Sequence, residues 1–120
     1  MKRIVVHHSA STLAVQFDSI NQWHKDKWNS ISELGFYGGY NYLIEKDGTL
    51  KQYRIEGEET IAQRGYNFDS LSVCLAGNFE RGIETPTQAQ IASLKAFLSE
   101  KMALYGLTPQ DIVPHRYLSS

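Results

Sequence analysis

The sequence predicts a single domain of the α/β (α+β) class, in which helices flank a central mixed β-sheet. Short apolar runs rich in β-branched residues alternate with two segments of helical periodicity, the pattern of helices packed on a sheet. A tight hairpin supplies one antiparallel pair of strands, and the helical connections permit parallel neighbours. The chain of 120 residues has the size of one domain.

The composition argues against several kinds of partner and scaffold. The formal net charge is −1, so no basic field attracts nucleic acid or an anionic membrane. No apolar run reaches transmembrane length, and the one near the N-terminus is too short for a signal peptide. The only cysteine, Cys74, excludes an internal disulfide. We therefore expect a monomer that is made in the cytoplasm without a signal peptide and does not insert into a membrane.

The chain begins with a strand and a helix. Residues 4–6 are consecutive β-branched residues, which indicate a central strand buried on both faces. A helix is predicted over residues 11–29, because Phe17, Ile20 and Trp23 recur at spacings of three.

The middle of the chain contains a hairpin of two strands and then an apolar strand. A hairpin is expected within residues 39–54, where Asp47 and Gly48 form a turn of the kind that needs a positive φ. Residues 71–79 then form a largely apolar strand.

The last third of the chain contains a second helix and a short extended segment. Residues 85–88, Thr-Pro-Thr-Gln, predict a capping box with Pro86 at the first helical position. The helix runs to about Tyr105, and Gly106 ends it. Residues 111–116 are extended and deliver one more histidine. The apolar stripe of this helix comprises Ile91, Leu94, Leu98, Met102 and Tyr105.

Four histidines are candidates for chemistry. His7 and His8 end the first strand and must point to opposite faces, because side chains alternate along a strand. His115 also follows a short apolar extended segment, and neutral imidazoles suit zinc. Ligands so far apart in sequence make a weak signal, and spacing alone favours ordinary polar roles for both. His24 lies mid-helix, where surface exposure or helix packing is the favoured role.

Cys74 is a possible soft ligand or nucleophile, but its position favours neither role. It lies in the middle of an apolar strand, where a free cysteine behaves as a small hydrophobic residue. A catalytic thiolate needs an electropositive and partly exposed setting, which these neighbours do not provide. We expect Cys74 to be buried and not to bind metal.

Five segments in this order resemble one known family. Together they are similar to the zinc-dependent N-acetylmuramoyl-L-alanine amidases, which include phage lysozymes of the amidase type and the peptidoglycan recognition proteins. The resemblance covers essentially the whole chain. The segments are IVVHHSAS, INQWHK, GGYNYLIEKDGTL, RGYNFDSLSVCLAGNF and IVPHR.

The resemblance implies a zinc site and a catalytic tyrosine. His7 and His115 match two zinc ligands of the family, with His8 as a non-ligand neighbour, and Tyr40 matches the tyrosine that assists catalysis. The family's third ligand, a cysteine or aspartate shortly after the late histidine, and a lysine or threonine near it have no counterpart before Ser120. We therefore expect residues 1–120 to be one amidase domain that is incomplete at its C-terminus.

The resemblance also implies peptidoglycan as substrate. Asn41, Arg64 and Asn67 are the predicted substrate-binding residues, and Arg64 would pair with a stem-peptide carboxylate. A histidine that the family often carries before the Gly-Tyr-Asn segment is absent, and Gln63 or Arg64 stands in its place.

Two functions of different classes remain open at this point. The first is Zn²⁺-dependent hydrolysis of the amide bond between N-acetylmuramic acid and L-alanine, a bacteriolytic, endolysin-like activity at the cell wall. The alternative is a peptidoglycan-binding module without catalysis, because some members of the family lack the third ligand. With two histidines as the only ligands named, we expect residues 1–120 to hold zinc loosely and to hydrolyse peptidoglycan poorly or not at all.

Overall fold

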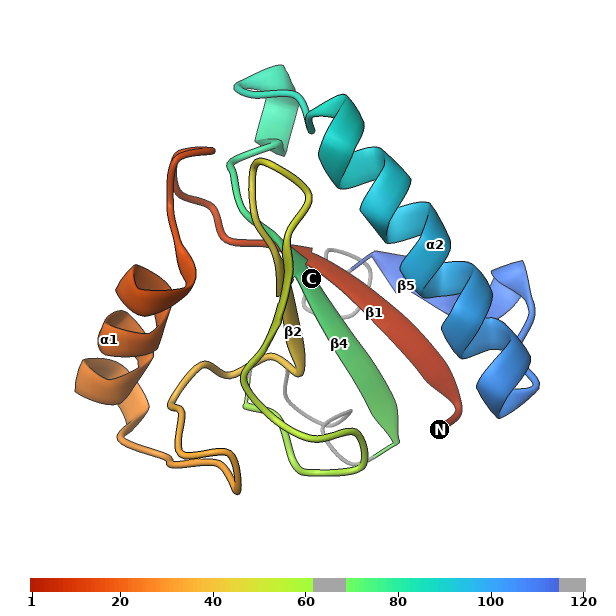
Figure 1. Ribbon diagram of the computed structural model, residues 1–120, viewed down its shortest axis with the longest axis horizontal. Coiled ribbons are helices and arrows are strands. Elements are labelled where there is room, and N and C mark those ends of the chain that lie inside the picture. Colours follow the sequence, from red (N-terminus) through yellow and green to blue (C-terminus); the bar gives the residue numbers. More distant parts are fainter. Residues whose placement is uncertain (62–68, 115–120) are drawn as a thin grey trace.

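The computed structural model describes residues 1–61 and 69–114 and contains a five-stranded mixed sheet with two helices (Figure 1). The elements are β1 (Arg3–His8), α1 (Phe17–Trp28), β2 (Tyr42–Ile44), β3 (Leu50–Gln52), β4 (Ser70–Leu75), the short 3-10 helix η1 (Glu80–Gly82), α2 (Gln88–Tyr105), a second one, η2 (Pro109–Asp111), and β5 (Ile112–Pro114).

The sheet has the strand order β3-β2-β4-β1-β5. β2 and β3 pair antiparallel across the predicted hairpin, and Gly48 takes the positive φ of 88° in its turn. The β1–β4, β1–β5 and β2–β4 pairs are parallel. The predicted fold class, a central mixed sheet flanked by helices, is therefore confirmed.

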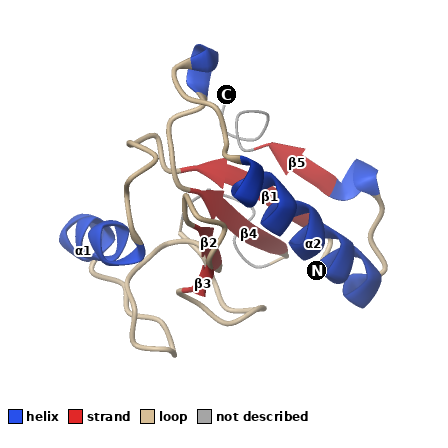
Figure 2. Cartoon of the chain, turned by 45° about the horizontal axis from the view of Figure 1, so that its top comes forward, coloured by secondary structure: helices blue, strands red, loops and turns tan. Residues whose placement is uncertain are grey.

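The two helices cover opposite faces of the sheet (Figures 1 and 2). Alternation along each strand divides its side chains between two clusters of buried apolar residues. The cluster under α2 consists of Ile4, Tyr42, Ile44, Leu71, Val73, Leu75 and Phe97. The cluster under α1 consists of Val15, Phe17, Ile20, Leu43, Tyr53, Cys74 and Ala76.

The first helix begins at Phe17, so the predicted start at residue 11 was wrong. Ala10 takes a positive φ of 57°, and the backbone N–H of Leu13 donates to Glu84 Oε2 (3.1 Å). The side chain of Gln16 does not cap the helix; Glu45 Oε2 accepts from the Phe17 N–H instead (2.9 Å). A carboxylate from the distant hairpin thus sets where α1 starts, since it satisfies a free N–H group at the positive end of the helix.

The second helix has a capping box, but two residues later than predicted. Thr87 is the N-cap: its Oγ1 accepts from the Gln90 N–H (3.0 Å), and Gln90 Oε1 accepts from the Thr87 N–H (3.0 Å). Gln90 is fully buried, and its Nε2 donates to Ala76 O (2.9 Å). The side-chain amide of Gln90 thus caps the helix and also bonds to the residue after β4. Local sequence does not encode this second, tertiary contact, which explains the shifted cap.

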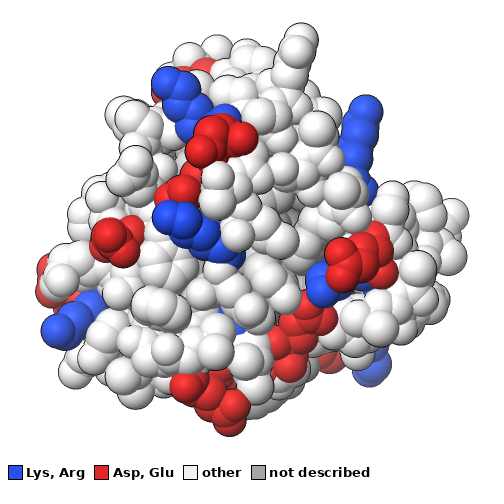
Figure 3. Space-filling model, viewed as in Figure 1, with Lys and Arg blue, Asp and Glu red and all other residues white. Residues whose placement is uncertain are grey.

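The packing of α2 agrees with most of its predicted apolar stripe. Leu94, Leu98, Met102 and Tyr105 pack against the core, while Ile91 is 40% exposed and lies outside it. Gly106 ends the helix with a positive φ of 67°, as predicted. Among the described residues, no helix is both long and apolar enough to cross a membrane. Charges of both signs are interspersed on the face shown in Figure 3.

Candidate active site

His7 lies on the α1 face of the sheet, next to Tyr40. It follows Val5 on that face of β1, and its side chain is only 3% exposed. The centroids of the His7 and Tyr40 rings are 5.1 Å apart, with the planes tilted by 52°. An imidazole at the end of a central strand therefore meets a phenol from the segment before β2.

His8 points to the opposite side, as strand alternation predicts. Its Nδ1 accepts a hydrogen bond from the Phe79 N–H (3.1 Å), and the two rings stack at 6.1 Å. Only one of the two adjacent histidines can thus contribute to a site on the α1 face.

Tyr40 is half-buried and contacts two imidazoles. Its ring lies 5.1 Å from that of His7 and 5.5 Å from that of His24. Burial, and then the neighbouring Cys74 and Tyr53, hold the pKa of the Tyr40 phenol well above its usual value. The hydroxyl therefore keeps its proton at neutral pH and can donate a hydrogen bond.

Cys74 lies beneath Tyr40 and is fully buried, as predicted. It forms a hydrogen bond with the Tyr40 side chain, and burial raises the pKa of its thiol to about 12. A thiol with such a pKa stays protonated at neutral pH, so the thiolate that a cysteine nucleophile requires does not form.

His24 packs as one of the two expectations for it allowed, but sequence reasoning assigned it no part in the site. It packs against Trp28 and Tyr40, with ring centroids 4.6 and 5.5 Å away, and its Nδ1 accepts from the Gly39 N–H (2.7 Å). A signal was present, because Phe17, Ile20 and His24 follow the spacing of three and four that marks the buried face of a helix. Trp23, predicted on that face, is instead 50% exposed.

Three comparisons with known proteins bear on this arrangement. A family model described as N-acetylmuramoyl-L-alanine amidase matches residues 1–120. The chain belongs to this family. The resemblance stated from the sequence, and the class of enzyme that it implied, are thereby confirmed.

The chain is similar in sequence to both phage and animal proteins. It is 33% identical over 108 residues to the endolysin of Escherichia phage T7, covering 85% of this chain and 67% of the endolysin. It is 31% identical over 108 residues to peptidoglycan-recognition protein SC2 of Drosophila melanogaster, covering 82% of this chain and 54% of that protein. The amidase LysC from Clostridium intestinale has the same fold, with a TM-score of 0.82, 28% identity and coverage of 99% of this chain and 72% of that one.

Of the remaining predicted site residues, the structure describes Asn41 alone. Asn41 is fully buried, its Oδ1 accepts from the Ser72 N–H (2.8 Å), and its Nδ2 donates to Ile55 O (3.0 Å). The predicted contact of Asn41 with substrate does not agree with this burial, because both ends of its amide already join backbone segments. His115, Arg64, Gln63 and Asn67 lie outside the described residues.

A metal centre was expected at His7 and His115, and the described residues offer no complete one. Within residues 1–61 and 69–114, no group of three His, Cys, Asp or Glu side chains is arranged to hold a metal ion. His7 is nevertheless suited to be one ligand, since a neutral imidazole on a rigid strand is a common donor to zinc. His24 is less suited, because its Nδ1 already accepts the Gly39 N–H.

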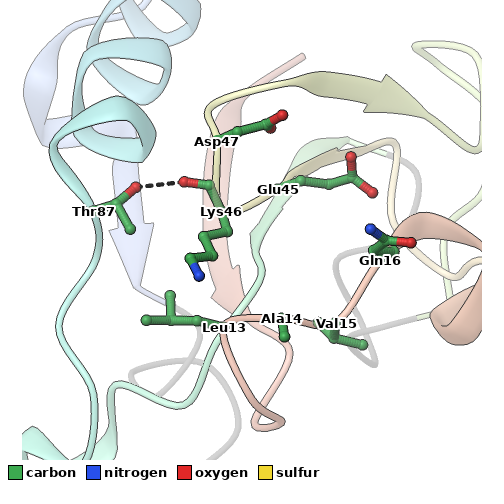
Figure 4. A pocket seen from close by; sticks show the side chains of 8 residues that line it. All are labelled: Leu13, Ala14, Val15, Gln16, Glu45, Lys46, Asp47 and Thr87. Carbon is green, nitrogen blue, oxygen red and sulfur yellow. Dashed lines mark hydrogen bonds between the residues drawn. The ribbon is translucent and has the colours of Figure 1, made fainter.

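A hollow of about 430 Å³ lies between the segment before α1 and the β2–β3 hairpin (Figure 4). Glu45, one of its polar groups, already accepts from the Phe17 N–H and forms an ion pair with Lys51 (3.3 Å). Of the predicted site residues that the structure describes, none lines this hollow, so the His7–Tyr40 pair is the candidate active site. The lining residues are Leu13, Ala14, Val15, Gln16, Glu45, Lys46, Asp47 and Thr87.

Proposed function

We propose that the chain is a zinc-dependent hydrolase of the amide bond between N-acetylmuramic acid and L-alanine in peptidoglycan. Membership of the amidase family supports the reaction, and the endolysin relatives support a role at the cell wall. The observation that carries the proposal is the contact of His7 with Tyr40 on one face of the sheet.

Zinc would be held by His7 and His115, together with a third ligand that is not assigned. The register between β1 and β5 supports this choice, because Val5 pairs with Val113 and Val6 with Pro114. Pro114, the last described residue of β5, thus lies opposite Val6, the residue before His7. Bound there, zinc would act as a Lewis acid on the scissile carbonyl and would activate a water molecule.

Tyr40 would stabilise the charge that develops during the reaction. Its ring lies beside that of His7 and its hydroxyl keeps the proton, and attack on an amide carbonyl creates an oxyanion that needs a hydrogen-bond donor. Loss of one comparable donor lowers turnover by roughly 10²–10³-fold. His7 would hold zinc on this face of the sheet, because its strand is fixed by pairing with β4 and β5.

A peptidoglycan-binding module without catalysis is the second candidate. The similarity to a peptidoglycan-recognition protein favours it, together with the unassigned third ligand. Both candidates share peptidoglycan as the partner, and they differ in whether the chain breaks the amide bond.

The neighbouring histidines provide a matched test. We expect His7→Ala to lose bound zinc, measured by metal analysis after dialysis, and to lose lysis of purified cell walls in a turbidity assay. His8→Ala should keep both, because His8 points to the other face of the sheet. Zinc binding and lysis that survive in His7→Ala would refute the proposed site. Because residues 1–120 are expected to hydrolyse poorly, lysis is followed over long incubations with zinc in excess, and binding of muropeptide without any lysis would favour the binding module instead.

A further inference from the structure

Side chains of α1 hold the backbone that leads into Tyr40. Asn21 Oδ1 accepts hydrogen bonds from the N–H groups of Tyr37 (2.6 Å) and Gly38 (3.1 Å). His24 Nδ1 accepts from the next N–H group, that of Gly39 (2.7 Å). Two residues one helical turn apart thus bind three consecutive backbone donors that belong to no helix or strand.

The segment is also bound from its other side. Arg54, 3% exposed, donates from Nε to Gly38 O (2.8 Å) and from a terminal nitrogen to Ser30 O (2.6 Å). Both polar groups of the Gly38 backbone are therefore used, and the segment is tied to the helix on one side and to the chain after β3 on the other.

Close packing leaves this segment no room for side chains. A Cβ atom on Gly38 would lie 2.3 Å from the Tyr53 ring. A Cβ on Gly39 would lie 2.9 Å from Ile61 Cγ1 and 3.3 Å from the Trp28 ring. The two glycines allow the backbone to approach α1 closely enough to bond with its side chains, which explains the Gly-Gly pair before Tyr40.

His24 is suited to act as a permanent acceptor. Burial, with further contributions from Lys27 and Arg54, lowers the pKa of His24 to about 4. The imidazole is therefore neutral at neutral pH, with Nδ1 accepting and the proton on Nε2. Its ring also touches the Tyr40 ring directly, so it bonds to the residue before Tyr40 and packs against Tyr40 itself.

From these contacts we infer that Asn21 and His24 are positioning residues, which fix Tyr40 against His7 by binding the backbone of residues 37–39. This assignment rests on the proposed function, in which Tyr40 takes part in amide hydrolysis. The two residues act on the orientation of Tyr40 and do not touch the reacting atoms. Their loss should therefore lower kcat more than it changes KM.

A pair of isosteric variants tests the role of His24. Asn places its Oδ1 where His carries Nδ1, and Leu has nearly the same shape without the acceptor. We expect His24→Leu to speed hydrogen exchange of the Gly39 amide at least about fivefold, the effect of losing one hydrogen bond. It should also lose the nuclear Overhauser contacts between the Tyr40 and His7 rings, whereas His24→Asn keeps most of the protection and the contacts.

Kinetics on a soluble muropeptide complete the test. Displacement of a reacting group by about 1 Å costs up to about 10²-fold in rate. In His24→Leu we expect kcat to fall about 10-fold or more while KM stays within about twofold, with most of the loss restored in His24→Asn. Gln22→Ala is the control on the same helix, because that exposed side chain bonds to the equally exposed Asp26.

Asn21 provides a second test if His24→Leu does not fold. Asn21→Leu removes the acceptor of two N–H groups, and Asn21→Asp keeps an acceptor of the same shape. Equal ring contacts and equal kcat in the Leu and the acceptor-keeping variants would overturn the positioning role. Absence of hydrolysis by the parent chain would bear on the proposed function alone, because the exchange and ring-contact measurements decide without it whether the two residues position Tyr40.

Discussion

Tyr40 and Tyr42 lie two positions apart in the sequence but on opposite faces of the sheet, in contrasting surroundings. Under α2, the Tyr42 hydroxyl donates to Glu56 Oε2 (2.5 Å), and its ring packs edge-on against Phe97 at 5.0 Å. Lys101, only 9% exposed, forms an ion pair with the same carboxylate (2.5 Å). The polar groups on this face satisfy one another and join the chain after β3 to α2.

The α1 face places Tyr40 among groups of a different kind. The neighbours of its ring are the imidazoles of His7 and His24, and its hydroxyl bonds to the thiol of Cys74. Imidazoles bind metals and move protons, whereas the carboxylate–ammonium pair on the other face has its charge balanced already. One residue type thus serves stability on one face and, in our proposal, catalysis on the other.

Asn41 explains how the two tyrosines come to face opposite ways. In a regular strand, positions 40 and 42 would share a face. Asn41 interrupts the ladder, because its side-chain Oδ1 accepts the Ser72 N–H while its backbone O accepts the Tyr53 N–H (2.9 Å). The regular strand starts only at Tyr42, which leaves Tyr40 on the α1 side.

Removal of the carboxylate under α2 should have the largest effect on stability. Glu56→Ala leaves the hydroxyls of Tyr42 and Tyr105 without their acceptor and removes the closer carboxylate from the Lys101 ammonium. We expect the free energy of unfolding to fall by about 2–4 kcal/mol, measured by urea denaturation. Glu100→Ala, which removes a 72% exposed partner of Lys101, should cost less than about 1 kcal/mol. A similar loss of unfolding free energy in both variants would show that the buried contacts of Glu56 with Lys101, Tyr42 and Tyr105 do not stabilise the fold.

Replacement of Asn41 should lower both stability and hydrolysis. Asn41→Leu leaves the buried Ser72 N–H without its acceptor, at a cost of about 1–3 kcal/mol in unfolding free energy. Because Asn41 sets the start of the regular strand, hydrolysis should fall as well. Unaltered hydrolysis in a destabilised Asn41→Leu protein would show that the tyrosines take their faces without this residue.

The two tyrosine-to-phenylalanine variants should have opposite signatures. Tyr42→Phe removes a hydrogen bond to Glu56 and should cost about 1–2 kcal/mol in unfolding free energy, with hydrolysis unchanged. Tyr40→Phe should change the unfolding free energy by less than about 1.5 kcal/mol and leave zinc content unchanged, while turnover falls by about 10²-fold. Parent-like turnover in Tyr40→Phe would remove the tyrosine from the proposed mechanism.

Acid should destabilise the α1 face through His24. The pKa of His24 is about 4 in the folded protein, below its ordinary value of 6.5, so the unfolded chain binds more protons between these values. Stability should therefore fall as the pH drops from 6.5 toward 4. The charged and titratable groups facing His24 are Lys27, Arg54 and Tyr40. Urea midpoints should show less of this decline in His24→Asn, and an identical decline would assign it to other groups.

The α2 face responds to acid in a lower range. Burial raises the pKa of Glu56, but hydrogen bonds from Lys101, Tyr105 and Tyr42 outweigh it and leave the pKa below its ordinary value of 4.5. The stability that this carboxylate contributes is thus present above pH 4.5 and is lost as the pH falls through its folded-state pKa. One series of urea midpoints against pH should therefore separate the two faces, because the loss of stability caused by His24 begins at a higher pH than the loss caused by Glu56.

The sequence by itself determined the elements and the family. Apolar periodicity and turn residues predicted the strands, the hairpin at Gly48 and the end of α2 at Gly106, because these depend on local backbone preferences. Alternation along β1 was enough to separate His7 from His8. The order of short segments identified the amidase family.

The tertiary structure alone decided the caps and the neighbours of Tyr40. Glu45 starts α1 and Gln90 joins α2 to β4, and both contacts link residues far apart in the chain. The burial of Asn41 and the contact of His24 with Gly39 likewise depend on how α1 is placed against the sheet. A polar side chain shows its type in the sequence, but its partner is set by packing, so type alone did not distinguish residues that build the fold from those that serve the site.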